Sequence, residues 1–364
     1  MNRKFRQAVF FLLAAGTAWL IFARPELCTV SLREGLQLCG GPLLVSLLPF
    51  LIVSSLAVRS GAGETLGILF CPAARLIGIR GSGARSAGGV LLIGFLGGFA
   101  PAASAVRDAV QTGRLTARQA SALLPACICS GPSFVVLTVG GQLLGSRALG
   151  MRLFAAQLLA GYLTAALLGR LHRCEEPEIT ASVPEEPLPG LDELIAQATI
   201  AYLKLCGFVL YFRLLAAGCG QILPGRLAVL PAMLLEVCSG CDYAARTGLW
   251  ASSLCCTALS LQGASVLLQV RTLCPPEVSL RPLLAARLVH LPLSLALFWL
   301  GWPEQTAEAF STLSGRIVTM QRVPLDCALL AFAVCCMTAW EAARLAFCQK
   351  AGTVKSGLDR KSEI

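Results

Sequence analysis

Two short stretches interrupt long apolar runs with residues that break helices and form hydrogen bonds. Ser130–Ser133 lies inside "PACICSGPSFVV", and Gln262–Ser265 lies inside "LSLQGASVLLQV". Both have the form Gly-x-Ser, with a polar residue near the glycine. A helix that breaks inside an apolar run leaves free backbone N–H groups and a positive dipole end, which attract an anion or a polar ligand. The two stretches therefore predict a solute-binding site.

Charged and amide side chains accompany these breaks. Glu236 ends an apolar run just before Cys238–Asp242, which we predict to be a third break. A carboxylate at membrane depth is expensive and marks a functional site. Arg281 starts the next apolar run and Arg287 lies deeper in it, and both can pair with carboxylates in a two-pronged geometry. They point roughly 120° apart on a helix, so both line one site only if it wraps around that helix.

Gln269 follows Ser265 by four residues and shares its helical face. The complete set of residues that we predict to bind the solute is Ser130, Gly131, Ser133, Glu236, Ser239, Gln262, Gly263, Ser265, Gln269, Arg281 and Arg287.

A plainer interpretation exists for each feature alone. Either break can be a kink or a loop whose serines bond their own backbone. Arg281 can mark a membrane boundary, and Arg287 can extend its charge towards the membrane surface. Matched interruptions in two halves of a chain are typical of a transporter site, and this pairing favours a cavity.

The amino-acid composition indicates that membrane helices position these residues. The chain has 364 residues, is 56% hydrophobic and 14% charged, and has a mean hydropathy of +0.72. Soluble domains are about 25% charged. These values predict an all-α, multi-pass membrane protein with room for about eight to ten spans of roughly 20 residues. The net charge of +10 comes from basic residues scattered between apolar segments, which indicates juxtamembrane loops beside lipid rather than binding of nucleic acid.

The apolar segments fall into two groups separated by an acidic stretch. The N-terminus is basic and no small-x-small cleavage site precedes Arg24, which predicts an uncleaved first helix with a cytoplasmic start. The predicted divisions are N-terminal membrane helices at 1–60, a first repeat at 61–171, an acidic Pro-rich loop at 172–190, a second repeat at 191–300, a connecting loop and membrane helix at 301–347, and a basic polar tail at 348–364.

Signatures of metal, redox and enzyme sites are missing from the sequence. The 17 cysteines lie mostly in apolar segments, where cysteine behaves as a small hydrophobe. Cys238 and Cys241 have metal or redox spacing but no second pair, and His172 and His290 are far off in sequence. No zinc-protease, serine-hydrolase or P-loop motif occurs. We therefore expect no metal, no cofactor and no enzymatic activity, so that any transport draws on a gradient, a trapping step or a partner.

Several motifs resemble known families. The stretches Gly97–Ala103, Leu115–Ala120 and Cys129–Phe134 resemble the nucleoside-recognition ("gate") domain. The whole layout over residues 35–300 is similar to the sporulation integral membrane protein family of the YlbJ type. The segments that match its signatures are Pro42–Phe50, Leu235–Gly240, Gln262–Gln269 and Arg281–Arg287.

This resemblance implies two inverted repeats with broken or re-entrant helices, on the plan of concentrative nucleoside carriers. It implies a transporter of a small anionic solute, dipicolinate, in the cell membrane or the outer forespore membrane during sporulation. The alternatives are a non-transporting scaffold for spore-envelope assembly and a nucleoside-type carrier. Ile128-Cys129 replaces the family's asparagine before Ser-Gly-Pro, and Pro101-Ala-Ala-Ser replaces Pro-x-Gly-Ala. Because of these departures, the resemblance does not define the substrate. The sequence also does not define the coupling ion, the direction of transport or the oligomeric state.

Overall fold

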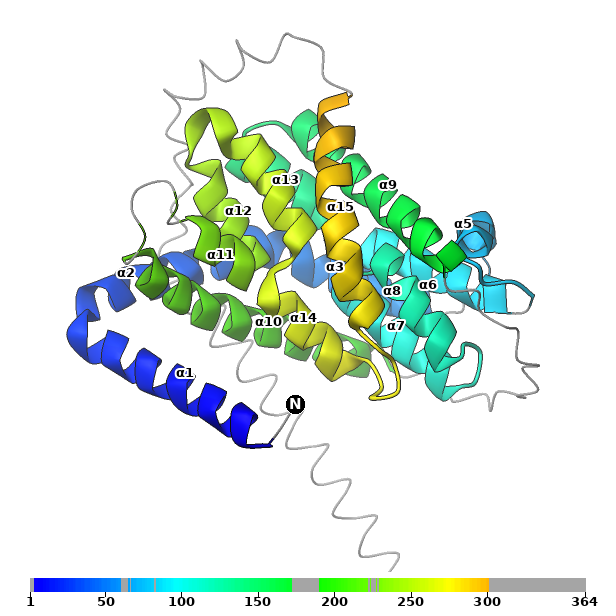
Figure 1. Cartoon of the computed structure of the whole chain (residues 1–364), viewed down its shortest axis with the longest axis horizontal. Helices are drawn as coiled ribbons and strands as arrows, with labels where there is room; N and C mark the ends of the chain where they lie inside the picture. The colour runs from blue at the N-terminus through cyan, green and yellow to red at the C-terminus, as the bar shows by residue number, and fades with distance from the viewer. Residues whose placement is uncertain are drawn as a thin grey trace, which may run out of the picture.

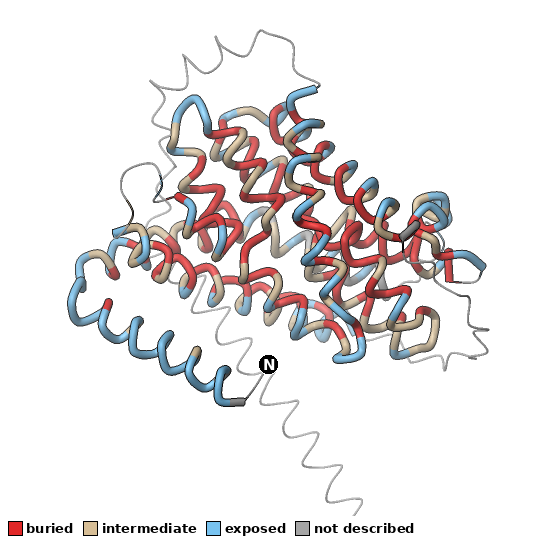
Figure 2. Tube along the Cα trace, in the orientation of Figure 1, coloured by how far each residue is buried: buried red, intermediate tan, exposed pale blue. Residues whose placement is uncertain are grey.

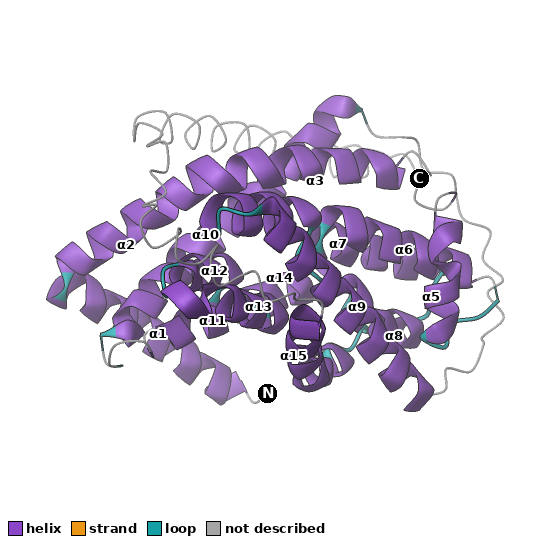
Figure 3. Cartoon of the chain, turned by 90° about the horizontal axis from the view of Figure 1, so that it is seen from above, coloured by secondary structure: helices purple, strands orange, loops and turns teal. Residues whose placement is uncertain are grey.

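The computed structural model describes residues 3–59, 65, 67–81, 83–171, 190–221, 223, 227 and 229–300. Every regular element in these ranges is a helix (Figures 1 and 3). Most of the predicted acidic loop, the helix predicted within 301–347 and the tail at 348–364 lie outside the described residues.

Four helices are long and apolar enough to cross a membrane: Arg147–Gly169, Leu191–Gly220, Gly248–Leu273 and Arg281–Leu300. A bent pair, Gln7–Ala23 with Pro25–Leu43, makes a fifth if it counts as one span despite its 107° bend. The chain is thus an integral membrane protein. The described part has fewer full spans than the sequence suggested, because several apolar runs, such as Gly83–Gly97 and Ser133–Leu143, form shorter helices.

The N-terminal elements are α1 (Arg3–Ala23), α2 (Pro25–Leu38), the π-helix η1 (Cys39–Leu43) and α3 (Leu44–Arg59). Pro25 occupies the first turn of α2, where its missing N–H and fixed φ suit a helix start. Helix α1 extends from the rest of the molecule as an arm, and most of its residues are exposed (Figures 1 and 2).

The first half continues with η2 (Gly67–Phe70), α5 (Cys71–Leu76), α6 (Gly83–Gly97), α7 (Phe99–Gln111), α8 (Ala117–Cys127), η3 (Ser133–Leu143) and α9 (Arg147–Leu171). Thr116 and Gln119 form a capping box that starts α8. The chain breaks between α6 and α7 at Gly98, whose φ of 80° only glycine adopts readily.

The second half consists of α10 (Leu191–Gly220), α11 (Val229–Leu235), α12 (Val237–Ala245), η5 (Gly248–Trp250), α13 (Ala251–Leu261), α14 (Gly263–Leu273) and α15 (Arg281–Leu300). The predicted break at Cys238–Asp242 is wrong in position, because these residues lie within α12. The chain breaks earlier, at Glu236, which has extended backbone angles and caps α12.

Both halves run through the same series of elements. Two broken helices, α6/α7 and α8/η3, precede the long helix α9, and two more, α11/α12 and α13/α14, precede the long helix α15. Helix α15 packs against both α9 and α13, between which it lies in Figure 1, so the halves share one interior. A single buried apolar cluster extends from Leu38 to Phe298 through both of them. Their inverted orientation and carrier-like plan stay predictions.

Candidate functional site

Glycines bring the breaks of each half into backbone contact. In the first half, a Cβ placed on Gly98 would lie 2.7 Å from the backbone nitrogen of Gly131. In the second half, a Cβ on Gly263 would lie 2.8 Å from the backbone nitrogen of Glu236. Gly98 and Gly263 also have positive φ, at 80° and 69°. The two broken helices of each half therefore cross where only glycine fits.

Gln262 connects the break of one half to the break of the other. It separates α13 from α14, and its left-handed backbone (φ 60°) is the one positive φ outside glycine in the described ranges. Its side-chain Nε2 donates to the carbonyl oxygen of Ile128 at 2.8 Å. That carbonyl lies at the end of α8, where helix carbonyls lack partners within the helix. The two sequence-predicted breaks are therefore in contact.

Arg287 lies at this contact. Its Nη2 donates to Gln262 Oε1 at 2.7 Å and to the Ile128 carbonyl at 3.2 Å, while its Nη1 donates to the Ser260 carbonyl at 3.2 Å. The side chain is 8% exposed, and its Nε has no hydrogen-bond partner among the described residues. All three acceptors are neutral, and no ion pair involves Arg287 within the part of the chain that the structure describes. Among the described residues, it is a buried cation without a counter-ion.

A chain of buried polar groups continues from Arg287 across α13, α9 and α15. The Ser260 and Ser294 hydroxyls are 2.5 Å apart. Gln157 Nε2 donates to Ser260 Oγ at 2.9 Å and to the Cys256 carbonyl at 3.0 Å. His290 Nε2 lies 3.0 Å from the Gln157 carbonyl. Sequence reasoning did not select these residues, although a glutamine, a histidine and serines in long apolar helices are the signal by which they could have been found.

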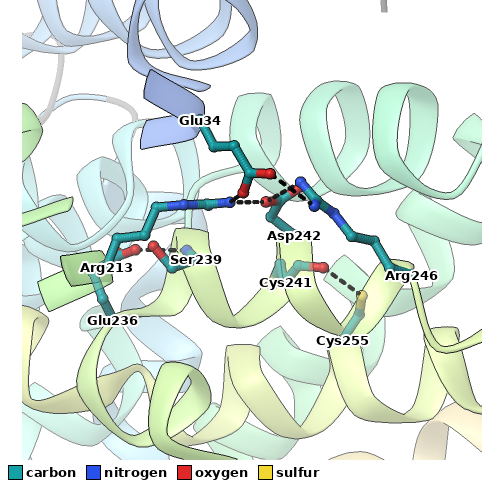
Figure 4. A network of polar contacts seen from close by, with 8 residues as sticks. All are labelled: Glu34, Arg213, Glu236, Ser239, Cys241, Asp242, Arg246 and Cys255. Carbon is teal, nitrogen blue, oxygen red and sulfur yellow. Dashed lines mark hydrogen bonds and ion pairs between the residues drawn. The ribbon is translucent and has the colours of Figure 1, made fainter. Parts of the chain in front are cut away.

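A second polar cluster joins α2, α10 and α12 (Figure 4). Arg213 Nη2 lies 2.6 Å from Glu34 Oε2 and 2.7 Å from Asp242 Oδ2. Arg246 Nη2 lies 2.8 Å from Asp242 Oδ2, and its Nη1 lies 3.5 Å from Glu34 Oε1. The Arg213 guanidinium also stacks over the Tyr243 ring, 4.8 Å from its centroid. No pattern in the sequence predicted this cluster.

The other predicted residues divide into internal pairs and one exposed arginine. The Glu236 carboxylate accepts from the backbone N–H groups of Cys238 and Ser239, at 2.9 and 2.6 Å, at the start of α12 (Figure 4). Gln269 Nε2 donates to Ser265 Oγ at 3.0 Å, which confirms that they share a face. Ser130, Gly131 and Ser133 are buried beside the first break, and the Ser239 hydroxyl is buried without a hydrogen-bond partner among the described residues.

Arg281 lies apart from Arg287. It is exposed and lines a cavity of about 580 Å³ with Arg118, Ser121 and Ser279, between α8, α9 and α15. The two arginines thus occupy different environments on α15. Arg287 belongs with Gln262 and the first break, whereas Arg281 belongs to an open hollow.

No group of three or more His, Cys, Asp and Glu side chains is placed to hold a metal ion in the described ranges. No protein-family model matches the chain, and no curated protein or solved structure matches it significantly. The resemblance to the sporulation family therefore rests on the sequence motifs.

Proposed function

We propose that this protein is a membrane transporter of small anionic solutes and that Arg287 binds the solute between the two halves. The observation that carries this proposal is the buried guanidinium at the contact of the two breaks, which has no counter-ion in the described ranges. Removing a charge from water costs several kcal/mol unless an opposite charge compensates it. A solute carboxylate supplies that compensation.

The solute that best fits both the guanidinium and the family resemblance is dipicolinate, carried across the outer forespore membrane during sporulation. It is a planar dicarboxylate, and the planar guanidinium fork matches carboxylate oxygens in a two-pronged geometry. The sequence motifs similar to the YlbJ-type family support this choice of solute and membrane.

Solute binding at Arg287 would also allow one half of the protein to move against the other. Arg287 now donates to Ile128 at the end of α8 and to Gln262 at the end of α13. A carboxylate that takes over these N–H groups releases one of the links between the halves. Movement of one repeat against the other is the usual basis of alternating access in carriers with broken helices.

The test is uptake of dipicolinate by vesicles that contain the purified protein. Arg287→Gln removes the charge but keeps a side-chain donor, and Arg246→Gln is a matched control that removes one positive charge elsewhere. We expect Arg287→Gln to lose uptake and Arg246→Gln to retain it. Charge-assisted hydrogen bonds contribute about 1.5–3 kcal/mol each, so the loss of one is worth on the order of tenfold to a hundredfold in affinity.

Each alternative gives a different result. Uptake of an uncharged nucleoside that Arg287→Gln leaves unchanged would identify a nucleoside-type carrier. Absence of any uptake by the parent protein would favour the scaffold for spore-envelope assembly, in which the contacts of Arg287 only hold the halves together.

A further inference from the structure

One ring nitrogen of His290 forms a hydrogen bond, and the other has no partner among the described residues. Its Nε2 lies 3.0 Å from the Gln157 carbonyl, which can only accept, so Nε2 carries a hydrogen. In a neutral imidazole the other nitrogen, Nδ1, then has a lone pair. Nδ1 is buried and has no hydrogen-bond partner in the described part of the chain, and the residue is 4% exposed. A proton can add at Nδ1 without breaking an existing hydrogen bond.

His290 is also coupled to Arg287 by position. It follows Arg287 by three residues on α15, so the two side chains lie on neighbouring parts of one helical face. Ser260 links them through space, since its carbonyl accepts from Arg287 and its hydroxyl accepts from Gln157. The anion site and the free imidazole nitrogen belong to one buried polar network.

The side chains that contact His290 from neighbouring helices are uncharged. Arg287, one turn earlier on α15, is the permanently charged residue of this network. Helix α15 packs against α8, α9 and α13. From α9 comes the neutral Gln157, and from α13 comes Cys256, whose thiol is 4.0 Å from Ser294 Oγ. At the end of α8, the buried Cys127 and Cys129 flank Ile128, whose carbonyl accepts from Arg287. No ion pair joins His290 to a carboxylate among the described residues.

These observations lead to a statement about coupling, which rests on the proposed function. We propose that His290 takes up one proton at Nδ1 for each dicarboxylate that binds at Arg287, so that a proton gradient drives solute movement. The proton comes from the water on the side where the solute loads. It leaves to the water on the opposite side when the solute departs.

Charge balance is the physical reason. Two positive charges close together in a low-dielectric interior repel each other strongly. An anion at Arg287 removes this repulsion, and the two negative charges of a dicarboxylate are matched by one guanidinium and one imidazolium. Because binding couplings are reciprocal, the solute increases proton affinity and the proton increases solute affinity by the same factor.

The direct test is proton uptake on addition of dipicolinate to the purified full chain in weakly buffered detergent solution with a pH dye. The measurement is made between about pH 6.5 and 8, where both carboxylates of the solute stay ionised, since carboxyl groups titrate near pH 4. We expect about one proton per bound solute for the parent and none for His290→Gln, which keeps a donor for the Gln157 carbonyl. His172→Gln replaces the chain's other histidine and is expected to behave as the parent.

A second measurement needs no variant. One-proton linkage makes the dipicolinate affinity of the parent rise about tenfold for each unit that the pH falls while His290 is neutral in the free protein. In vesicles, a proton gradient alone should then accumulate dipicolinate.

The outcomes separate this inference from the proposed function. Dipicolinate binding by the parent without proton uptake and with a flat pH dependence would overturn the role of His290 and leave the anion site intact. Proton uptake by His290→Gln equal to that of the parent would also overturn it. Absence of dipicolinate binding at every pH would refute the proposed function itself.

Discussion

Two buried arginines of this protein have opposite surroundings. Arg213 is fully buried on α10 and donates to the carboxylates of Glu34 and Asp242. Arg287 is nearly as buried on α15, but its acceptors in the described part of the chain are two backbone carbonyls and one amide oxygen. Burial of an arginine therefore does not by itself indicate a ligand site. The absence of a counter-ion among the described residues is what distinguishes Arg287.

The two regions use their arginines for different purposes. The cluster of Arg213, Arg246, Glu34 and Asp242 contains two positive and two negative groups, so its charges balance. It holds α2, α10 and α12 together. The Arg287 contacts hold the breaks of the two halves through neutral groups alone, among the residues that the structure describes. We infer that the first region maintains the fold and that the second is available to a solute.

Removal of each arginine should have unequal effects on stability. Arg213→Met leaves two carboxylates near each other without their central cation, and breaking a buried pair in this way costs about 3–5 kcal/mol. Arg287→Met leaves only neutral acceptors unpaired, at about 1–3 kcal/mol. Unfolding of the two variants in the same detergent checks the order. Equal destabilisation would contradict the distinction between paired and unpaired arginine.

The backbone around the two arginines should also respond differently to a methyl group. Gly263→Ala places a Cβ 2.8 Å from the Glu236 nitrogen at a φ of 69°. A left-handed residue other than glycine alone costs roughly 1–2 kcal/mol, and the contact adds to this. Gly207→Ala, on the same helix as Arg213, meets nothing within 4 Å and should stabilise that helix by about 0.5–1 kcal/mol. Thermal unfolding measures both, and a neutral Gly263→Ala would mean that the crossing of α11/α12 and α13/α14 can open without strain.

Lysine in place of each arginine should affect different properties. Arg287→Lys keeps the charge but loses the planar fork, so dipicolinate affinity should fall on the order of tenfold to a hundredfold with little change in unfolding temperature. Arg213→Lys should lower the unfolding temperature and leave dipicolinate affinity near that of the parent. Binding measured by calorimetry, alongside thermal unfolding, gives both values for each variant. Loss of stability without loss of affinity in Arg287→Lys would make Arg287 a second structural arginine.

The long helices were predictable because membrane spans need uninterrupted apolar runs of roughly 20 residues. The breaks at Ser130–Ser133 and Gln262 were predictable because helix breakers and polar residues are conspicuous there. The break at Gly98 was not, since glycine in an apolar run also serves close packing. Glu236 was placed correctly as a buried acid, but its action as a helix cap moved the third break ahead of Cys238–Asp242.

The Arg213 cluster was out of reach of the sequence for a different reason. Glu34 and Arg213 are 179 residues apart, and no local pattern connects them. Periodicity identifies which face of a helix is apolar, but it does not identify the segment that packs against that face. One shared site for the two breaks was expected only because they resemble each other, which gave the chain an internal comparison, and no pattern pointed to Ile128 as the partner of Gln262.

The smallest expected effect concerns Arg246, which shares both carboxylates with Arg213 but is 52% exposed in its side chain. An exposed ion pair typically contributes about 0.2–1 kcal/mol, because water competes for both charges and the side chain loses freedom. Arg246→Gln should therefore destabilise the protein by no more than about 1 kcal/mol, and added salt should shrink even that difference. Unfolding of Arg246→Gln and the parent at low and high salt measures both effects, with Arg213→Met as the matched buried variant.

A loss of stability in Arg246→Gln as large as that in Arg213→Met would mean that all four charges act as one buried unit. Arg213 would then owe its stabilising role to the whole cluster rather than to its own two carboxylates.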